Sequence, residues 1–407
     1  MVKINHVAIV GGCGHVGLPL GIVLAAHGGY QVTLIDIDTK KVDAVNAGQM
    51  PFRETGAEEV LRQVIKQNLC ATTDSASLRT ADAVITAVGT HVDEHLNPTV
   101  NALFADVERT IQEMQQNSLL VLRSTVYPGV TRLIFELIRA RNVHIHVAFC
   151  PERIVEGKAL EELNKLPQII SAFEPKALEK ARELFGRIAP QIIELTPLEA
   201  ELAKLFSNSW RYLNFAISNQ FFMLAQSHGA DFYKIHDAVT RNYPRMSAFQ
   251  RAGFTGGPCL LKDTLHLSAF SGNDFFMGHA AMLINEGLPS FVVDQLRGKD
   301  LAKLRVAILG MAFKGDSDDS RDSLSYKLKK LLQLHALEVI CTDPFVPDPT
   351  LVPLEEAINR ADIIILGAPH SAYRNLKFPA EKTVVEIWGF WPERGKVSAS
   401  DPLDAKI

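Results

Sequence analysis

The stretch VAIVGGCGHVG at residues 7–17 decides the fold of this chain. A strand-like apolar run is followed by Gly12, Gly14 and Gly17 in the spacing GxGxxG, at the place where a helix is expected to begin. The first glycine permits a tight turn, the second lets backbone approach a pyrophosphate, and the third lets the helix pack on the strand. We therefore predict a βαβ unit that binds a dinucleotide at its helix N-terminus, through the turn residues that include His15 and Val16.

An acidic residue ends the second predicted strand. The run VTLID closes at Asp36, about 20 residues after the glycines, where a carboxylate accepts hydrogen bonds from a ribose diol and repels a 2′-phosphate. This pattern predicts NAD rather than NADP. The alternative is a glycine-rich turn without a ligand, but strand, helix and acid together favour the cofactor site.

The apolar runs occur in two corresponding sets. The first set lies at residues 7–10, 32–36, 83–88, 119–124 and 144–149, and the second at residues 305–310, 337–343, 362–367 and 383–388. Longer helix-like segments separate them, which is typical of parallel sheets built from βαβ units. We predict an α/β chain with two Rossmann-like doubly wound domains. The second glycine turn, GMAFKG, lacks the third glycine, so a phosphate ligand other than a dinucleotide is expected there.

A long helix is predicted between the two sets, because no Gly or Pro interrupts the chain between Pro197 and Gly229. Thr196 and Glu199 form a capping box, and Gly229 supplies the left-handed stop. At 1.5 Å per residue this helix is about 45 to 50 Å long. Its many apolar residues predict that it joins the two halves and forms a subunit interface, with a core helix of a monomer as the alternative. The predicted domains are residues 1–195, 196–295 and 296–407, the middle one being small and helical.

Composition limits the classes of function. The 407 residues are 47% hydrophobic and 22% charged with a net charge of −4, so no nucleic-acid partner is expected. No export signal or apolar run of about 18 residues is present, so no membrane association is expected. The five cysteines are scattered without a CxxC pair, which predicts no disulfide framework, no metal site and a reducing cytoplasm.

One cysteine follows a glycine-rich segment, in GFTGGPCLLKD at residues 253–263. If a helix begins at Cys259, then Lys262 and Asp263 share its face. A thiol at a helix N-terminus beside a lysine should have a lowered pKa and react as the thiolate. The alternative is a small buried hydrophobe. A cysteine that is buried only for packing does not need a flexible segment before it. The presence of Gly256 and Gly257 therefore favours a catalytic role for Cys259.

Other charged and polar residues have two interpretations each. Lys204 and Asn208, four residues apart on the long helix, are either oxyanion donors or a solvated face. Glu152 and Glu156 follow a strand end, where they are either a base and a water-holder or helix-start charges. Lys314 and Arg321 flank an acidic stretch and are either a phosphate clamp or exposed charges, and charge alone favours the second.

With these motifs in order, the chain resembles the UDP-glucose/GDP-mannose dehydrogenase family of nucleotide-sugar 6-dehydrogenases. The resemblance covers nearly the whole chain. It rests on eight ordered segments: GGCGHVGLPL, VTLIDID, GQMPFRETG, RSTVYPGVT, FCPERIVEGKAL, AKLFSNSWR, GFTGGPCLLKDT and AFKGDSDDSRDS.

The resemblance implies a four-electron oxidation of a primary alcohol to a carboxylate, with two NAD used in succession and one water. Cys259 would trap the aldehyde as a thiohemiacetal and then carry a thioester. The other implied catalytic roles are oxyanion stabilisation by Lys204 and Asn208, control of the thiol protons by Asp263, and positioning of the attacking water by Thr125 and Glu152.

The resemblance also implies binding residues. Those on the cofactor side are Lys41, Thr90, Thr125, Glu156, Lys262 and Arg321. Lys314 and the Gly256 segment would hold the nucleotide sugar, together with Glu152, Lys204 and Asn208. Arg245, in NYPRM, matches an arginine that reaches into the neighbouring subunit's site, so a homodimer is implied.

NYPRM and GGPC are closer to members of the family that oxidise UDP-N-acetylhexosamines than to those that oxidise UDP-glucose. The implied product is a uronate for polysaccharide synthesis. Two alternatives remain, a two-electron β-hydroxyacid dehydrogenase and a non-catalytic NAD-sensing protein. A two-electron alcohol oxidation has no use for a covalent step, whereas oxidation of an aldehyde to an acid does, so Cys259 favours the four-electron reaction.

Overall fold

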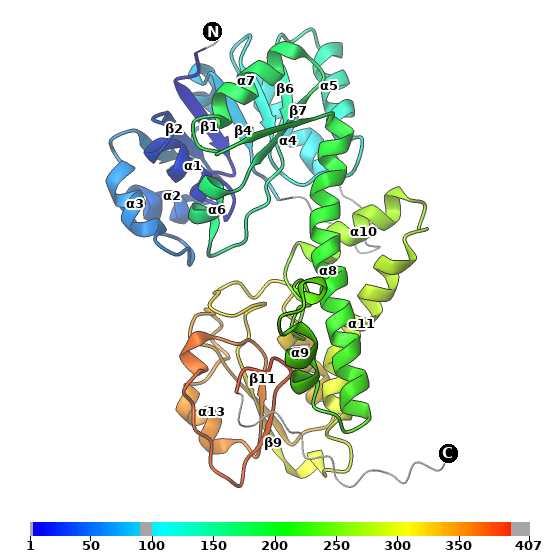
Figure 1. Ribbon diagram of the computed structural model, residues 1–407. Helices are drawn as coiled ribbons and strands as arrows, with labels where there is room; N and C mark the ends of the chain where they lie inside the picture. The colour runs from blue at the N-terminus through cyan, green and yellow to red at the C-terminus, as the bar shows by residue number, and fades with distance from the viewer. Residues whose placement is uncertain (1–2, 90–99, 392–407) are drawn as a thin grey trace. The chain divides into compact units, whose positions relative to one another are not determined.

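The computed structural model describes residues 3–89 and 100–391. Thr90, one of the expected cofactor residues, lies outside the described residues. The chain forms two compact units, an N-terminal unit of Met1–Ser207 with Leu265–Gly272 and a C-terminal unit of Asn208–Thr264 with Asn273–Ile407. Figure 1 shows both.

The N-terminal unit is built on an eight-stranded sheet in the order β3-β2-β1-β4-β5-β6-β7-β8. All neighbouring strands are parallel except β6 and β7. The doubly wound α/β fold predicted from the apolar runs is therefore confirmed. The strands are β1 His6–Val10, β2 Gln31–Ile35, β3 Leu69–Thr72, β4 Ala83–Thr86, β5 Leu119–Leu122, β6 His146–Phe149, β7 Gln168–Ala172 and β8 Ile192–Leu195.

Helices cover both faces of this sheet, because successive strand residues point to opposite faces. Val7 and Ile9 of β1 belong to a core with α1, α3, α6 and α7, whereas Ala8 belongs to a second core with α4 and α5. The helices are α1 Gly17–Ala26, α2 Thr39–Asn46, α3 Ala57–Val64, α4 Val100–Glu113, α5 Val130–Ala140, α6 Ala159–Lys165 and α7 Pro175–Phe185, with a 3₁₀ turn at Ser75–Thr80.

The C-terminal unit contains a four-stranded parallel sheet in the order β10-β9-β11-β12. Its strands are β9 Arg305–Leu309, β10 Glu338–Thr342, β11 Ile363–Leu366 and β12 Thr383–Val385, which confirms the second predicted set. Val306 and Ile308 pack on one core and Ala307 and Leu309 on the other. The helices of this part are α9 Phe232–Thr240, α11 Phe276–Asp294, α12 Leu324–Leu332 and α13 Leu354–Arg360, with 3₁₀ turns at Pro244–Met246, Leu301–Lys303 and Ser371–Tyr373.

The long central helix is confirmed as α8, Pro197–Ser227, which at 1.5 Å per residue spans about 46 Å. The Thr196 backbone N–H and hydroxyl both donate to Glu199 Oε2, at 2.8 and 2.7 Å, and Gly229 has a φ of +67°. The left-handed stop and one half of the predicted capping box, the bond from the Thr196 N–H to the Glu199 carboxylate, are therefore present. Among the described residues, no helix combines the length and the apolar character needed to cross a bilayer.

Candidate active site

The glycine turn lies at the carboxyl end of β1, between Val10 and the start of α1. A Cβ on Gly12 would lie 2.7 Å from the Ile9 oxygen, and one on Gly17 would lie 2.4 Å from the Gly11 oxygen. These two glycines are fixed by packing within the turn. A Cβ on Gly14 would meet only the Gly11 oxygen at 3.4 Å, an ordinary contact, so the chain itself does not require a glycine there.

This geometry fits the phosphates of a dinucleotide. Without a side chain at Gly14, a phosphate can approach the backbone closely. Helix α1 begins three residues later and has no acidic residue in its first turn. A helix N-terminus with unpaired N–H groups attracts an anion. His15 stacks on Phe52 with ring centroids 4.0 Å apart, so its ring forms one wall of the turn.

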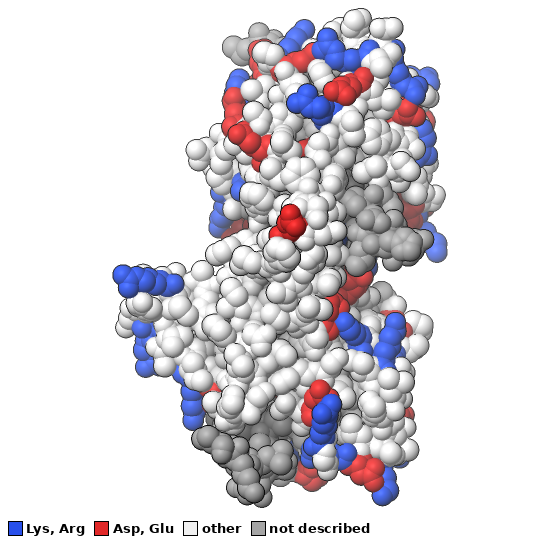
Figure 2. Space-filling view, turned by 90° about the vertical axis from the view of Figure 1, so that its right-hand side faces the viewer, with Lys and Arg blue, Asp and Glu red and all other residues white. Residues whose placement is uncertain are grey.

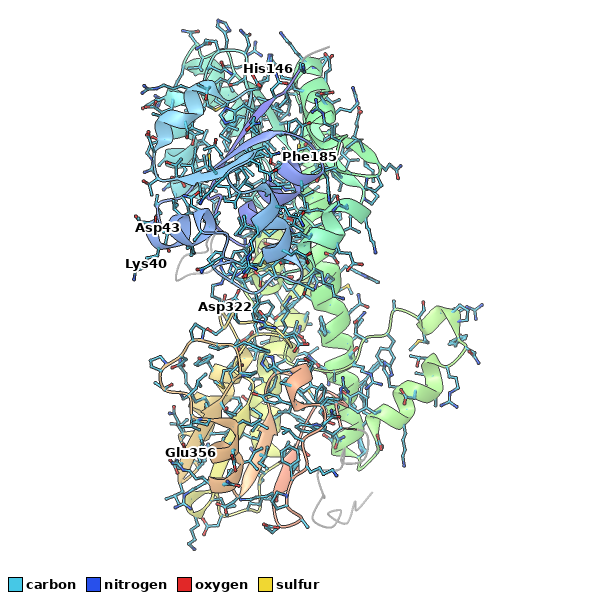
Figure 3. The ribbon with its side chains drawn as sticks, turned by 90° about the vertical axis from the view of Figure 1, so that its left-hand side faces the viewer. Lys40, Asp43, His146, Phe185, Asp322 and Glu356 are labelled. Atoms are coloured by element: carbon cyan, nitrogen blue, oxygen red, sulfur yellow. The ribbon has the colours of Figure 1, made fainter. Side chains whose placement is uncertain are left out.

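Asp36 follows β2 and reaches back to the glycine turn. Its Oδ2 accepts from the Cys13 N–H at 3.0 Å and its Oδ1 from the Asp38 N–H at 3.1 Å. A carboxylate has about four acceptor sites, so both oxygens can still accept from a ribose diol. Burial and the charge of Asp36 raise the pKa of the Cys13 thiol to about 12, and the charge of Lys41 opposes this rise. Lys41 is therefore near the predicted cofactor site. Figure 3 labels its neighbours Lys40 and Asp43 on the outer side of α2.

The loops after β5 and β6 carry the remaining candidates of this unit. Thr125 and Glu156 are half-buried in these loops, and Glu152 is 7% exposed. Glu152 Oε1 accepts from the Ile154 N–H, and its Oε2 lies 3.9 Å from Nη2 of Arg123. Burial raises the pKa of Glu152, while the charges of Arg123 and Lys204 lower it. The carboxyl edge of the sheet thus gathers the glycine turn, Asp36 and Glu152, as doubly wound sheets do.

Cys259 is exposed and immediately precedes α10, Leu260–Phe270. The Asp263 N–H donates to the Cys259 carbonyl at 2.9 Å, so Cys259 occupies the N-cap and lies one turn from Asp263. Asp263 is fully buried, with Oδ2 accepting from Asn208 Nδ2 at 2.6 Å and Oδ1 at 3.2 Å from Lys262 Nζ. Lys262, Asp263 and Asn208 are therefore in contact, with one N–H of Asn208 used on Asp263, and the backbone of Cys259 lies one turn away.

The glycines before Cys259 are explained differently from the expectation. A Cβ on Gly256 would lie 2.6 Å from the Asp322 carbonyl, and one on Gly257 would lie 2.6 Å from the Phe313 ring. Packing thus does require both glycines, and the expectation that only a catalytic cysteine needs them is wrong. Their effect is to join the cysteine loop to the loop after β9, where Figure 3 labels Asp322.

That second loop carries Lys314 and Arg321. Arg321 donates from Nε to both oxygens of Asp319 at 3.0 Å and from Nη2 to Oδ2 at 2.6 Å, while its side chain stays 55% exposed. Lys314 Nζ lies 5.5 Å from the centroid of the Phe313 ring. Arg245 is exposed beside Tyr243, with its guanidinium carbon 5.9 Å from that ring centroid.

Asp343 ends β10 as Asp36 ends β2, but its hydrogen bonding is different. Its Oδ2 accepts from Met311 and Ala312 N–H at 2.6 and 3.0 Å and from His370 Nε2 at 2.9 Å. Its Oδ1 accepts from two further backbone N–H groups, at 2.8 and 3.0 Å. Five donors saturate this carboxylate, which agrees with the expectation that the second half lacks a dinucleotide site.

Arg123 is the residue of this group that was not predicted from the sequence. It is 2% exposed and directly follows the all-apolar strand β5. A charged residue at the carboxyl end of a buried parallel strand was the available signal, since such a residue needs a partner.

These features define a class of protein: two α/β sheets built mostly of parallel strands, a glycine turn suited to a dinucleotide on the first, and an exposed cysteine one helical turn from a buried aspartate. Three consecutive segments of the chain match the three domain models of one protein family. Residues 5–189 match the NAD binding domain of the UDP-glucose/GDP-mannose dehydrogenase family, residues 198–286 its central domain and residues 307–391 its UDP binding domain. The chain belongs to this family, and NAD is its cofactor.

Relatives and solved structures agree with this assignment. UDP-N-acetyl-D-mannosamine dehydrogenase of Methanocaldococcus jannaschii is 30% identical over 379 residues, covering 89% of this chain and 86% of the relative. The structure of UDP-D-ManNAc dehydrogenase from Pyrococcus horikoshii is 26% identical with a TM-score of 0.88, covering 95% and 96% of the two chains. A UDP-glucose dehydrogenase structure from Pyrobaculum islandicum is 26% identical with the same TM-score of 0.88, covering 97% and 96%. The backbone similarity therefore does not separate these two substrates.

Proposed function

We propose that this chain catalyses the NAD-dependent four-electron oxidation of the 6-hydroxymethyl group of a UDP-N-acetylhexosamine to the uronate, through a thioester on Cys259. The observation that carries the proposal is the exposed Cys259 at the start of α10, one turn from the buried Asp263. The relatives named as UDP-N-acetyl-D-mannosamine dehydrogenases support this sugar class. The uronate would serve polysaccharide synthesis.

The reaction balances as one alcohol, one water and two NAD⁺ giving one carboxylate, two NADH and three protons. NAD supplies the hydride acceptor at both oxidation steps. The Cys259 thiolate adds to the aldehyde carbon after the first step, and loss of the second hydride leaves the thioester. Water then adds to the thioester carbon, the carbon–sulfur bond breaks, and the thiolate of Cys259 is regenerated.

We propose roles for the remaining residues from the family resemblance, together with the contacts of Lys204 and Asn208. Lys204 is 8% exposed, and its positive charge is suited to the alkoxide-like oxygen that forms at each addition step. Asn208 shares this role through its second N–H, since its first holds Asp263. Glu152 accepts the proton of the attacking water, which Thr125 helps to hold. Lys262 and Arg321 act on the cofactor side, and Lys314 with the Gly256 segment on the nucleotide sugar. An exposed catalytic thiol requires a reducing compartment, so we propose a cytoplasmic location.

The first experiment measures stoichiometry. We expect two NADH per molecule of sugar oxidised, with UDP-N-acetylhexosamines preferred in a panel that includes UDP-GlcNAc, UDP-GalNAc, UDP-ManNAc, UDP-glucose and GDP-mannose. C259A should form no uronate while still binding NAD. C70A is the matched control, because Cys70 is also exposed but lies on β3, and it should keep full activity. One NADH per sugar with release of an aldehyde or ketone would reject the proposal in favour of a two-electron dehydrogenase, and NAD binding without turnover would indicate a sensing protein.

We also propose a homodimer formed by α8. One face of this helix carries large apolar side chains spaced seven, four and three residues apart, which is the spacing of a helix–helix seam. They are exposed by 46 to 62%, namely Trp210, Ile217, Phe221 and Leu224. On α11 the side chains of Phe276, Met277 and Leu283 are 74%, 62% and 69% exposed. Figure 2 views the side that carries these helices, and uncharged side chains predominate over them. A patch of this kind favours a partner with the same surface.

The dimer test uses charge and complementation. W210E should convert a dimer to a monomer in light scattering, whereas the same change at Leu334, an exposed residue after α12, should not. If Arg245 acts in the neighbouring subunit's site, inactive R245A and inactive C259A proteins should regain about a quarter of the wild-type activity after random subunit exchange, because only mixed dimers hold one intact site. Recovery of no activity by a mixture shown to exchange would place Arg245 outside the neighbour's site.

A further inference from the structure

We propose that Arg123 is a positioning residue for thioester hydrolysis, a permanent buried counter-charge that orients the Glu152 carboxylate toward the attacking water. This inference rests on the proposed function. Neither the family comparison nor the expected roles of the site residues assigns Arg123 a part in the reaction.

The guanidinium of Arg123 is held through one nitrogen and one aromatic contact, while its Nε is buried and has no hydrogen-bond partner in the described part of the chain. Its Nη1 donates to the Cys150 carbonyl at 3.0 Å, to Gln168 Oε1 at 2.7 Å and, at 3.4 Å, to the Pro151 carbonyl. Its guanidinium carbon lies 5.3 Å from the ring centroid of Phe185, a fully buried residue of α7 that Figure 3 labels inside the N-terminal unit. These contacts and the burial of the side chain, which is 2% exposed, favour a fixed position for the guanidinium.

Glu152 is held by one oxygen only. Its Oε1 accepts from the Ile154 N–H, whereas Oε2 is buried and has no hydrogen-bond partner within the described part of the chain. The nearest charge to Oε2 is Nη2 of Arg123 at 3.9 Å, too far for a hydrogen bond but close enough for strong attraction in a buried site. A buried acceptor without a donor costs about 1 to 3 kcal/mol. A water molecule bound at Oε2 would remove this cost, and we assign this molecule as the attacking water.

Three charged groups act on the pKa of Glu152, from three different elements. Arg123 follows β5, Lys204 lies on α8, and Glu162 lies on α6 and opposes the other two. Burial raises the pKa of Glu152, and Arg123 is the charge that lowers it most, ahead of Lys204. In the proposed reaction, Lys204 shares its charge with the substrate oxygen as that oxygen becomes negative. Arg123 makes all its hydrogen bonds with the protein, so its effect on Glu152 persists through every step.

The step that depends on Arg123 is the last one. The water oxygen adds to the thioester carbon while its proton moves to Oε2 of Glu152. The carbon–sulfur bond then breaks, Cys259 leaves as the thiolate, and Glu152 later releases the proton to solvent. The glutamate must be ionised when the water attacks, and this requirement gives the proposal a signature in pH.

The variants are R123M, which keeps the apolar stem and removes the charge, and R153M as the matched control. Arg153 is the next residue after Glu152, but its guanidinium donates to the Pro167 carbonyl and it is not among the charges that act on Glu152. The measurements are the pH dependence of kcat, rapid-mixing NADH release, and the intact mass of the quenched enzyme. With wild-type protein we expect two NADH per sugar.

For R123M we expect the acid limb of the kcat profile to move up by about one to three pH units, because an opposite charge within about 4 to 6 Å has been removed. At pH values below the new limb, a burst of two NADH per site should precede turnover slowed by about 10²-fold, with the acylated Cys259 visible by mass. R123K should restore part of the shift, and R153M should match wild type. A structural role alone would lower activity without moving the limb or trapping the thioester.

The outcomes separate the two claims. If wild-type enzyme releases one NADH or none per sugar, the proposed function fails. If wild-type enzyme releases two NADH and R123M shows neither the shifted limb nor the burst, the role of Arg123 is refuted and the proposed function stands. If R123M does not fold, R123Q decides, since its neutral amide can donate to the Cys150 carbonyl that Arg123 now binds at 3.0 Å. An acid limb that rises in R123Q supports the role of Arg123, and an unmoved limb refutes it.

Discussion

Replacement of Gly14 by alanine should separate cofactor binding from folding. The new Cβ would make an ordinary contact at 3.4 Å with the Gly11 oxygen, and the φ of Gly14 is not among the positive values of the chain. The native structure therefore accepts alanine, and the loss of chain entropy in the unfolded state should stabilise it by about 0.4 to 1 kcal/mol. The methyl group would nevertheless stand where a pyrophosphate must approach the backbone.

The size of the binding loss follows from the bonds involved. A hydrogen bond to a charged group contributes about 1.5 to 3 kcal/mol, so the loss of one backbone–phosphate bond raises the Kd for NAD by about 10 to 100-fold. G17A is the control, because its Cβ would lie 2.4 Å from the Gly11 oxygen and 2.8 Å from the Gly12 Cα, so it should lower the unfolding midpoint as well. Calorimetric titration with NAD and thermal unfolding of both variants give the answer. G14A with unchanged NAD affinity and an unchanged midpoint would refute the proposed path of the pyrophosphate.

Three further predictions concern carboxylate and amide groups. D36A should weaken NAD binding and relax discrimination against NADP in competition titrations; an unchanged preference would exclude Asp36 from ribose recognition. Burial acts to raise the pKa of Asp343, but hydrogen bonds from His370 and the backbone lower it from 3.8 to about 2. The contribution of this lowered pKa to the free energy of unfolding is complete above pH 4 and disappears as the pH falls toward 2. D343N should therefore be less stable than wild type by about 2 kcal/mol at pH 7. In denaturant titrations, this difference in the free energy of unfolding should narrow between pH 4 and pH 2. N219L should lower the unfolding midpoint, because Asn219 binds both the N–H and the carbonyl of Gly253, at 2.9 and 3.1 Å. Each buried polar group left without a partner costs about 1 to 3 kcal/mol. An unchanged midpoint would show that the segment before Cys259 is stable without the bonds to Asn219.

The sequence predicts the centre of each sheet better than its edges. Every strand predicted from an apolar run is present, because central parallel strands are buried on both faces and contain few polar residues. β3 and β8 lie at the two edges of the larger sheet, and their burial alternates or is only partial, so they have no continuous apolar run. β7 pairs with β6 in the antiparallel direction, which no single-strand pattern could indicate.

In the candidate site, too, contacts between residues close in sequence could be predicted and contacts between distant segments could not. Cys259 and Asp263 are one helical turn apart, so their spacing alone predicts that they lie on one side of the helix. The approach of Arg123 to Glu152 depends instead on the register of β5 against β6, in which Leu122 pairs with Phe149. Neither strand specifies that register by itself, so the pair could be expected only after the two strands were placed side by side.

The two halves of the chain show why an acid after the second strand is not sufficient to indicate a ribose site. Asp36 and Asp343 occupy corresponding positions, and each receives backbone N–H groups from its own glycine turn. Asp36 accepts two hydrogen bonds and keeps acceptor capacity for a diol, whereas Asp343 accepts five, one of them from His370. The His370 Nδ1 in turn accepts from the Asp316 N–H at 2.9 Å, which fixes the proton on Nε2 and directs it to Asp343. Asp343 thus has three donors that Asp36 lacks: His370, the Val346 N–H and a second N–H of the turn. Together they convert a ribose-binding position into an internal support for the loop that carries Lys314.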